Sequence, residues 1–279
     1  MLYRYCAMII LHSGRAWSMF DLHDNGAHGT ALGACDETLV EPGNYIILDQ
    51  GGQPITIELT TENPPRRVCT QDYHTRSEWQ SERDQLQRHF RNSLRARDGQ
   101  CAITGPSIIM SRDEPFTAMD AVHIFPTSLI QEWNQTGYRD WITDTSPASS
   151  IGESRLCSPQ NGLLLSRTMH GYFVHFKLGV DPDADYKIII FEGDNAGLGG
   201  TRLKDSARYG TSPDNRVSAQ ALRWHLKMCV YNVFRANSES GTVWEEDLGS
   251  DDMGEILEQP DAADRMEVEL STRLGAQMA

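Results

Sequence analysis

The sequence predicts an α+β fold, because strand patterns and helix patterns both occur and occupy separate parts of the chain. Short β-rich runs lie within the first sixty residues, at 45–48 and 55–59. Apolar residues recur at helical intervals over 77–97 and 219–234. A strand with the sequence YKIIIF lies between these helices, at 186–191. A chain of 279 residues can bury a core large enough to fold without staples.

The N-terminal region is predicted to be rich in β-structure. The opening run MLYRYCAMIIL predicts a buried first strand. His12, Ser13 and Arg15 interrupt it, whereas a secretory signal requires a longer apolar stretch and a small-residue cleavage site. The turn sequence QGGQP at 50–54 predicts a hairpin that joins the runs 45–48 and 55–59.

The helices that follow have clear ends. The helix over 77–97 is predicted to stop at Asp98-Gly99, where glycine supplies a left-handed cap. The glycine-rich stretch 197–200 lacks the spacing of a dinucleotide fingerprint, and it predicts a surface loop.

The chain is predicted to divide into three parts: a β-rich region at 1–76, a core with flanking helices at 77–236, and an acidic segment at 237–279 that packs on the core. A short helix is predicted within that segment, over 261–274.

Charge is distributed unevenly along the chain, whose formal net charge is −14. Residues 64–112 hold nine arginines against five acidic residues, whereas 239–279 hold twelve acidic residues against two arginines. An acidic total argues against a dedicated nucleic-acid binder, since such proteins gain affinity by neutralising phosphates. Nucleic acid is therefore an unlikely partner on this ground, although the acidity lies mostly in the last forty residues.

The cellular setting is predicted from the cysteines and from hydropathy. Six cysteines lie tens of residues apart with no C-x-x-C pair, which predicts reduced thiols and a cytoplasmic protein. A disulfide between Cys101 and Cys157 stays open as an alternative. No stretch reaches the roughly 18 apolar residues that a membrane span requires.

One constellation of side chains can carry chemistry. His123 ends an apolar strand, Asn161 follows a long loop, and His170 lies nine residues later on a helix that Ser166 can cap. A strand, a loop and a helix can bring these three residues together. The alternative is that the histidines are satisfied core residues and that Asn161 is a turn former.

Several short motifs surround these three residues. They are C-x-x-T-G at 101–105, A-x-H-I-x-P at 121–126, Q-N-G-L-L-L at 160–165, H-x-x-F at 170–173, D-P-D-x-x-Y-K-I at 181–188 and L-R-W-H at 222–225. Together these motifs resemble the HNH nuclease family, in its fungal branch. The resemblance covers roughly residues 85 to 275. It implies a ββα-metal core in which His123 is the general base, Asn161 holds its loop, and His170 is the first metal ligand of the helix.

The resemblance also exposes a gap in the metal site. The second helix ligand belongs four residues after His170, where this chain has Val174, and the residue before the base is Val122. His175 is offset by five residues, which rotates it about 140° away from His170. The sequence therefore predicts a degenerate HNH site that holds no metal and needs no cofactor.

Two classes of enzyme are compatible with these residues. The leading hypothesis is a metal-independent cyclase of the Diels-Alderase or pericyclase type in fungal secondary metabolism, acting on a small, apolar, terpenoid-like substrate. Such an enzyme holds its substrate in a reactive conformation and donates a hydrogen bond to an activating carbonyl. The residues assigned to this role are His123, Asn161 and His170 as catalytic residues, and Tyr172, His175, Trp133, Tyr138 and Trp141 as substrate-binding residues. The alternatives are a divalent-metal-dependent HNH endonuclease and a catalytically inactive interaction protein.

Overall fold

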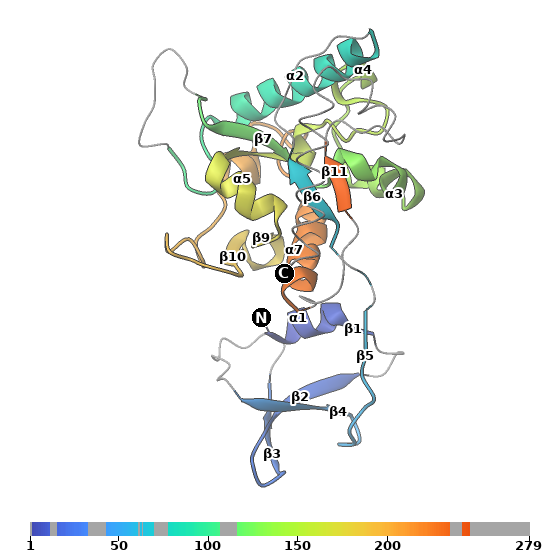
Figure 1. Ribbon diagram of the computed structural model, residues 1–279, viewed down its shortest axis with the longest axis vertical. Coiled ribbons are helices and arrows are strands. Elements are labelled where there is room, and N and C mark those ends of the chain that lie inside the picture. The colour runs from blue at the N-terminus through green and yellow to red at the C-terminus, as the bar shows by residue number, and fades with distance from the viewer. Residues whose placement is uncertain are drawn as a thin grey trace, which may run out of the picture. The chain divides into compact units, whose positions relative to one another are not determined.

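The computed structural model describes residues 2–11, 16–32, 43–60, 62, 64–69, 78–106, 116–234 and 242–245. It is an α+β protein, as predicted (Figure 1). The described residues fall into two compact units: those of 1–64 with 227–238, and those of 65–226 with 239–279. None of the described helices has both the length and the apolar composition that crossing a membrane demands.

The first unit begins with a helix, so the predicted first strand is wrong. α1 spans Leu2–Ile9, and β1 follows at Ile10–Leu11. Tyr5 and Ile9 are buried and stand four residues apart, which is the spacing of one helix face. The run has no proline or glycine, and its β-branched pair Ile9-Ile10 comes only where the strand starts.

The β-structure of this unit is a three-stranded antiparallel sheet with a separate two-stranded ribbon. β2 (Trp17–Leu22) lies between β3 (His28–Ala31) and β4 (Asn44–Asp49), and β1 pairs with β5 (Glu58–Leu59).

The predicted turn at 50–54 exists, and antiparallel pairing across it is shorter than predicted. Asp49 accepts hydrogen bonds from the backbone N–H groups of Gly51 and Gln53 and so shapes the turn. Ladder pairing stops at a single bridge between Leu48 and Pro54. The Asp49 N–H donates to the Gln53 carbonyl at 2.9 Å across the turn, and β4 also pairs with β2 along its whole length.

The second unit is built around a two-stranded antiparallel pair between two helices. β7 (Met119–His123) pairs with β8 (Gly162–Ser166), and both contact α2 (Glu78–Asp98) and α5 (Arg167–Val174). In Figure 1, α2 lies on one side of β7 and α5 on the other. α2 confirms the predicted helix, and Gly99 has the positive φ of +63° that its left-handed cap requires.

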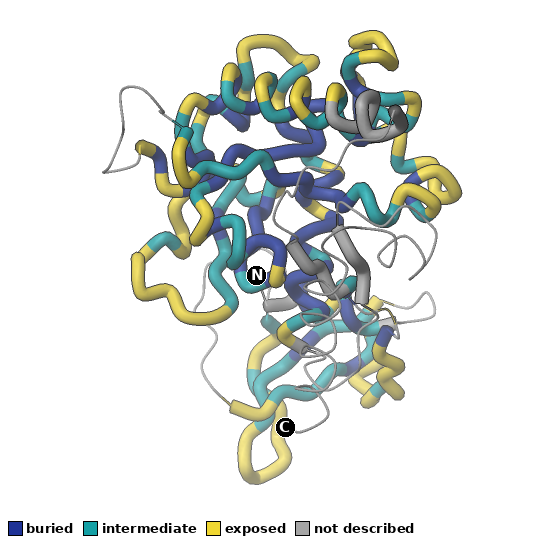
Figure 2. The backbone as a smooth tube through the Cα atoms, turned by 45° about the horizontal axis from the view of Figure 1, so that its top comes forward, coloured by how far each residue is buried: buried dark blue, intermediate teal, exposed yellow. Residues whose placement is uncertain are grey.

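Shorter elements surround this centre. They are α3 (Ile130–Gln135), α4 (Ala148–Ile151), α6 (Asp205–Tyr209), the antiparallel strands β9 (Leu178–Asp181) and β10 (Lys187–Ile190), and the parallel strands β6 (Arg66–Cys69) and β11 (Thr242–Glu245). β10 confirms the predicted strand, and the glycine-rich stretch after it is a largely exposed loop. Figure 2 shows buried backbone alternating with exposed turns.

The predicted helix over 219–234 is α7 (Ala219–Phe234), which begins in the second unit and ends in the first. Of the predicted acidic segment 237–279, the structure describes only β11. The predicted helix over 261–274 therefore lies outside the described residues, and the three-part division of the chain stays a prediction.

Candidate functional site

The predicted site residues lie on a ββα unit formed by β7, β8 and α5. Met119 pairs with Ser166 at one end of the two strands and His123 pairs with Gly162 at the other. Ser166 then caps α5, as predicted, because its Oγ accepts a hydrogen bond from the Met169 backbone N–H at 3.4 Å. α5 therefore runs back across the strand pair and places His170 over β7.

His123 is packed against α2. Its imidazole ring stacks on Phe90 with centroids 3.9 Å apart and an interplanar angle of 4°, and the residue is 8% exposed. Its strand partner Gly162 leaves room for the Phe90 ring, since a Cβ there would lie 2.4 Å from Phe90 Cζ. The His123 ring is thus part of the contact between the strand pair and α2.

Asn161 fixes the chain that follows His123. Its Oδ1 accepts a hydrogen bond from the Phe125 N–H at 2.9 Å, and its Nδ2 donates to the carbonyls of Phe125 at 3.0 Å and Leu156 at 3.1 Å. Its own carbonyl accepts from the Ile124 N–H at 2.9 Å. The side chain is fully buried, so these bonds form away from competing water. This is the loop-holding geometry that the resemblance implies.

His170 meets a residue that sequence reasoning missed. Its Nδ1 lies 2.9 Å from Asp120 Oδ2, and the two side chains are 22% and 34% exposed. Asp120 lies on β7 two residues before Val122, so strand alternation turns both toward α5. Alternation along β7 was the sequence signal for Asp120, whereas the resemblance points only to Val122, the residue before His123. The structure thus joins His170 to Asp120, while His123 contacts Phe90 on the α2 side.

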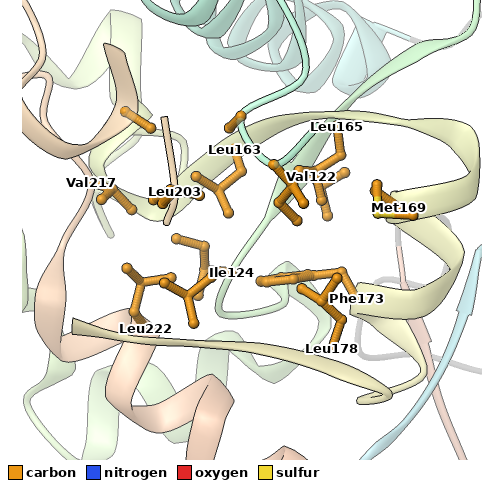
Figure 3. Close-up of a cluster of buried hydrophobic side chains, with 14 of the residues drawn as sticks. Val122, Ile124, Leu163, Leu165, Met169, Phe173, Leu178, Leu203, Val217 and Leu222 are labelled. Atoms are coloured by element: carbon orange, nitrogen blue, oxygen red, sulfur yellow. The ribbon is translucent and has the colours of Figure 1, made fainter. Parts of the chain in front are cut away.

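Both positions where the resemblance expects metal ligands belong to the hydrophobic core. Val122 is 3% exposed and Val174 is 1% exposed, and both pack in one cluster with Phe173. Figure 3 shows Val122 close to Leu163 and Leu165, with Phe173 facing it from α5.

The other donors nearby do not complete a metal site. His175 is exposed and ends α5, one position beyond the buried Val174. Among the residues that the structure describes, no three His, Cys, Asp or Glu side chains are gathered so that they could hold an ion. The donor set around α5 therefore does not fit the divalent metal that the resemblance implies.

The aromatic residues predicted to line a pocket form a cluster around Phe125. Trp133, Tyr138 and Trp141 each contact the Phe125 ring, and Tyr138 stacks on Trp141 at 3.8 Å. Trp133 is fully buried and donates its Nε1 hydrogen to the Ser154 carbonyl at 2.9 Å. These ring contacts are with one another and with Phe125, whereas the ring contact of His123 is with Phe90.

Tyr172 lies beside the core on α5. It is partly buried against the cluster that contains Val122, and a Cβ on Gly193 would lie 3.8 Å from its hydroxyl. Its ring therefore lies toward the loop that follows β10, and its position two residues after His170 is about 200° around the axis of α5 from that histidine.

A buried ion pair anchors the strand pair to α2. Arg97 and Asp98 form two hydrogen bonds, at 2.7 and 2.8 Å, with both side chains fully inaccessible. Arg97 also donates to the carbonyls of Pro159 at 2.7 Å and Gly162 at 2.8 Å, and Asp98 accepts from the Leu164 N–H at 2.9 Å. These bonds hold both sides of Asn161. The sequence indicated that the helix ends here, but it did not indicate which backbone groups Arg97 and Asp98 bind.

Burial also changes the titration of groups on the α2 side. It raises the pKa of the Cys157 thiol to about 11, so this thiol stays protonated at neutral pH. Burial and the neighbouring Arg91 lower the pKa of the Arg95 guanidinium, which lies 4.9 Å over the Phe116 ring. Cys101 and Cys157 are both free thiols, so the open pairing between them is not formed.

Comparison with known proteins agrees with the motifs. Residues 101–181 match the family model of the HNH endonucleases. The matched segment contains β7, Asn161, β8 and α5, so the chain carries an HNH endonuclease-like domain over these residues. No curated protein and no solved structure matches the chain.

Proposed function

We propose that the HNH-like domain is a metal-independent enzyme in which the Asp120–His170 pair carries out proton transfer or hydrogen-bond donation. The observation that carries this proposal is the 2.9 Å contact between His170 Nδ1 and Asp120 Oδ2 at a partly exposed position. A carboxylate bound at Nδ1 orients an imidazole and stabilises the positive charge that develops when Nε2 takes up a proton. Nε2 is then the nitrogen that exchanges a proton with a substrate.

The two buried valines support a mechanism without metal. Val122 and Val174 offer an ion no ligand atom, so the donors left between β7 and α5 are Asp120 and His170, and two side chains do not complete a divalent-metal site. Proton transfer by a positioned side chain contributes about 10²–10⁴-fold to a rate without any metal. The proposed roles are proton donor and acceptor for His170, orienting residue for Asp120, and loop-holding residue for Asn161.

The narrower form of the proposal is the cyclase hypothesis. In a Diels-Alder cyclisation two carbon–carbon bonds form and nothing leaves, so the enzyme supplies only conformation and a hydrogen bond to the activating carbonyl. The partly exposed His170 is better placed to donate that bond than His123, which is stacked on Phe90. The substrate class in this form is a small apolar metabolite. Tyr172 on α5 and His175 at its C-cap stay the predicted substrate contacts, and they lie about 200° and 140° around the helix axis from His170.

The second candidate is a divalent-metal-dependent HNH endonuclease. The match of residues 101–181 to the HNH endonuclease family favours it, since that family suggests a nuclease or related role. In this form the base would be His123, and the ligands would have to come from residues other than Val122 and Val174.

Metal dependence of the activity separates these candidates. The full chain is incubated with EDTA or with Mg²⁺ or Mn²⁺. One set of reactions contains plasmid DNA and RNA. A second contains a linear terpenoid that carries a conjugated diene and an unsaturated aldehyde. We expect turnover that EDTA leaves unchanged, measured as nucleic-acid cleavage or as loss of the diene absorbance. Cleavage that EDTA abolishes and Mg²⁺ restores would establish the endonuclease and overturn the proposal.

The residue roles are tested with matched variants. His170→Ala is expected to lower the rate about 100-fold and Asp120→Asn about 10-fold or more, because the first removes the proton-transfer group and the second its orienting charge. His89→Ala is the control, since His89 is an exposed histidine on α2 outside this site. Equal rates in His170→Ala and His89→Ala would remove His170 from the mechanism.

A further inference from the structure

A polar pocket lies outside the ββα unit, in the segment that leads into α6. It has a volume of about 370 Å³ and is lined by Gln100, Arg202, Leu203, Lys204, Asp205, Ser206 and Arg208. None of these residues belongs to β7, β8 or α5, so the pocket is separate from the Asp120–His170 pair.

The backbone of the pocket is fixed at several points. The Lys204 N–H donates to the Ala102 carbonyl at 2.8 Å, and the Leu203 N–H donates to the Tyr186 carbonyl at 3.0 Å. Leu203 is buried, and Figure 3 shows it in the core close to Val217. Alternation along this extended stretch turns Arg202 and Lys204 away from the core and toward the pocket.

The pocket carries an excess of positive charge. Arg202 pairs with Asp185 at 2.6 Å, and Arg208 pairs with Asp185 and, at 3.2 Å, with Asp205. Within the part of the chain that the structure describes, the ammonium group of Lys204 forms no ion pair. Three cationic side chains therefore share two carboxylates.

Two buried polar atoms here have no protein partner. Arg208 is 8% exposed, yet its Nε makes no hydrogen bond, and the same holds for the buried Oγ of Ser206. A buried donor without a partner is unfavourable, and such groups are normally satisfied by the protein, by water or by a bound ligand. Both residues line the pocket, so the donors that the protein leaves unused belong to side chains that border it.

We propose that this pocket binds a phosphate group. Guanidinium, ammonium, hydroxyl and amide groups together supply donors and positive charge, and a phosphate offers several acceptor oxygens and up to two negative charges to meet them. The volume exceeds what one phosphate fills, so inorganic phosphate and a small phosphomonoester are both possible sources. Lys204 supplies the uncompensated charge, and Ser206 supplies the hydroxyl donor.

Binding to the full chain tests the site. Inorganic phosphate and glycerol 3-phosphate are titrated separately by calorimetry at constant ionic strength. We expect saturable binding of at least one of them, and at least a 10-fold loss of affinity in Lys204→Gln. Tighter binding of glycerol 3-phosphate indicates a phosphomonoester as the ligand, tighter binding of inorganic phosphate indicates free phosphate, and equal binding shows that the site recognises the phosphate group alone.

Two further variants keep the test independent of folding. Lys177→Gln is the control, because Lys177 pairs with Glu192 and does not line the pocket. Ser206→Ala removes one hydroxyl and is expected to weaken binding about threefold or more, with an unchanged melting temperature. Absence of saturable binding in the native chain would overturn the proposal, as would equal affinities in Lys204→Gln and Lys177→Gln.

Discussion

Two pairs of charged or ionisable side chains lie on opposite sides of the β7–β8 strand pair, and their surroundings differ. Arg97 and Asp98 are fully inaccessible and bond to the backbone on both sides of Asn161. His170 and Asp120 are partly exposed and contact each other at 2.9 Å. A buried pair with all its bonds satisfied holds structure, and breaking it leaves an uncompensated charge. An exposed pair contributes little to stability, and its groups can reach a substrate. We therefore expect the pair on the α2 side to hold the fold, and we propose that the pair on the α5 side carries the chemistry.

The largest expected effect tests the structural side. Arg97→Ala removes the partner of a buried carboxylate and five hydrogen bonds, so we expect a loss of about 3–5 kcal/mol in the free energy of unfolding. Chemical denaturation of the full chain measures it. Arg223→Ala is the control, because its bonds to Asp183 are exposed and its loss should cost less than about 1 kcal/mol. Equal losses in the two variants would contradict the assignment.

The next effect tests whether the α5 side can become a metal site. Val174→Asp places a carboxylate four residues after His170, but in a position that is 1% exposed among apolar side chains. We expect the free energy of unfolding to fall by about 3 kcal/mol or more, because burying an unpaired charge is unfavourable. Melting temperatures with and without Mg²⁺, Mn²⁺ and Zn²⁺ measure it. Recovery of the native melting temperature in one of these metals would show that the family's site is intact apart from this side chain.

A smaller effect tests the packing of His123. Gly162→Ala puts a Cβ 2.4 Å from Phe90 Cζ and 2.9 Å from Leu94 Cδ1. Because this overpacks the core, we expect the free energy of unfolding to fall by about 1–3 kcal/mol. Gly171→Ala is the matched control, since nothing lies within 4 Å of its added Cβ and alanine favours the helix. Unfolding by urea compares them. If Gly162→Ala leaves the free energy of unfolding unchanged, the strand pair and α2 are less tightly packed than the His123–Phe90 stack indicates.

The smallest effect comes from an exposed ion pair in the first unit. The hydrogen bond from Lys227 Nζ to Glu62 at 2.7 Å lowers the pKa of the Glu62 carboxyl, and burial opposes this shift only in part. A lowered folded-state pKa stabilises the fold above the ordinary carboxyl pKa, and this stabilisation is lost as pH falls through the lowered value. Glu62→Gln should therefore cost at most about 0.5 kcal/mol at pH 6 and almost nothing at pH 3. Urea unfolding at both pH values measures it, and a cost that does not change with pH would contradict the assigned cause.

Local patterns were sufficient for part of the fold. α2, α7 and β10 were predictable because their apolar periodicity and end signals are carried by neighbouring residues. α1 was mistaken for a strand, since an eight-residue apolar run has almost the same appearance in either form. The pairing of β4 with β2 depends on residues more than twenty positions apart, which no local signal specifies.

For the candidate site, the sequence by itself determined the order of the ββα unit, the positions of His123, Asn161 and His170, and the presence of Val122 and Val174 where ligands were expected. Only the tertiary structure decided that His123 stacks on Phe90, that His170 meets Asp120 fifty residues away, and that Arg97 and Asp98 hold both sides of Asn161. The physical reason is that a residue type and its spacing describe which groups a chain can offer. Which of them become partners depends on how strands and helices from distant segments pack, and on how deeply each group is removed from water.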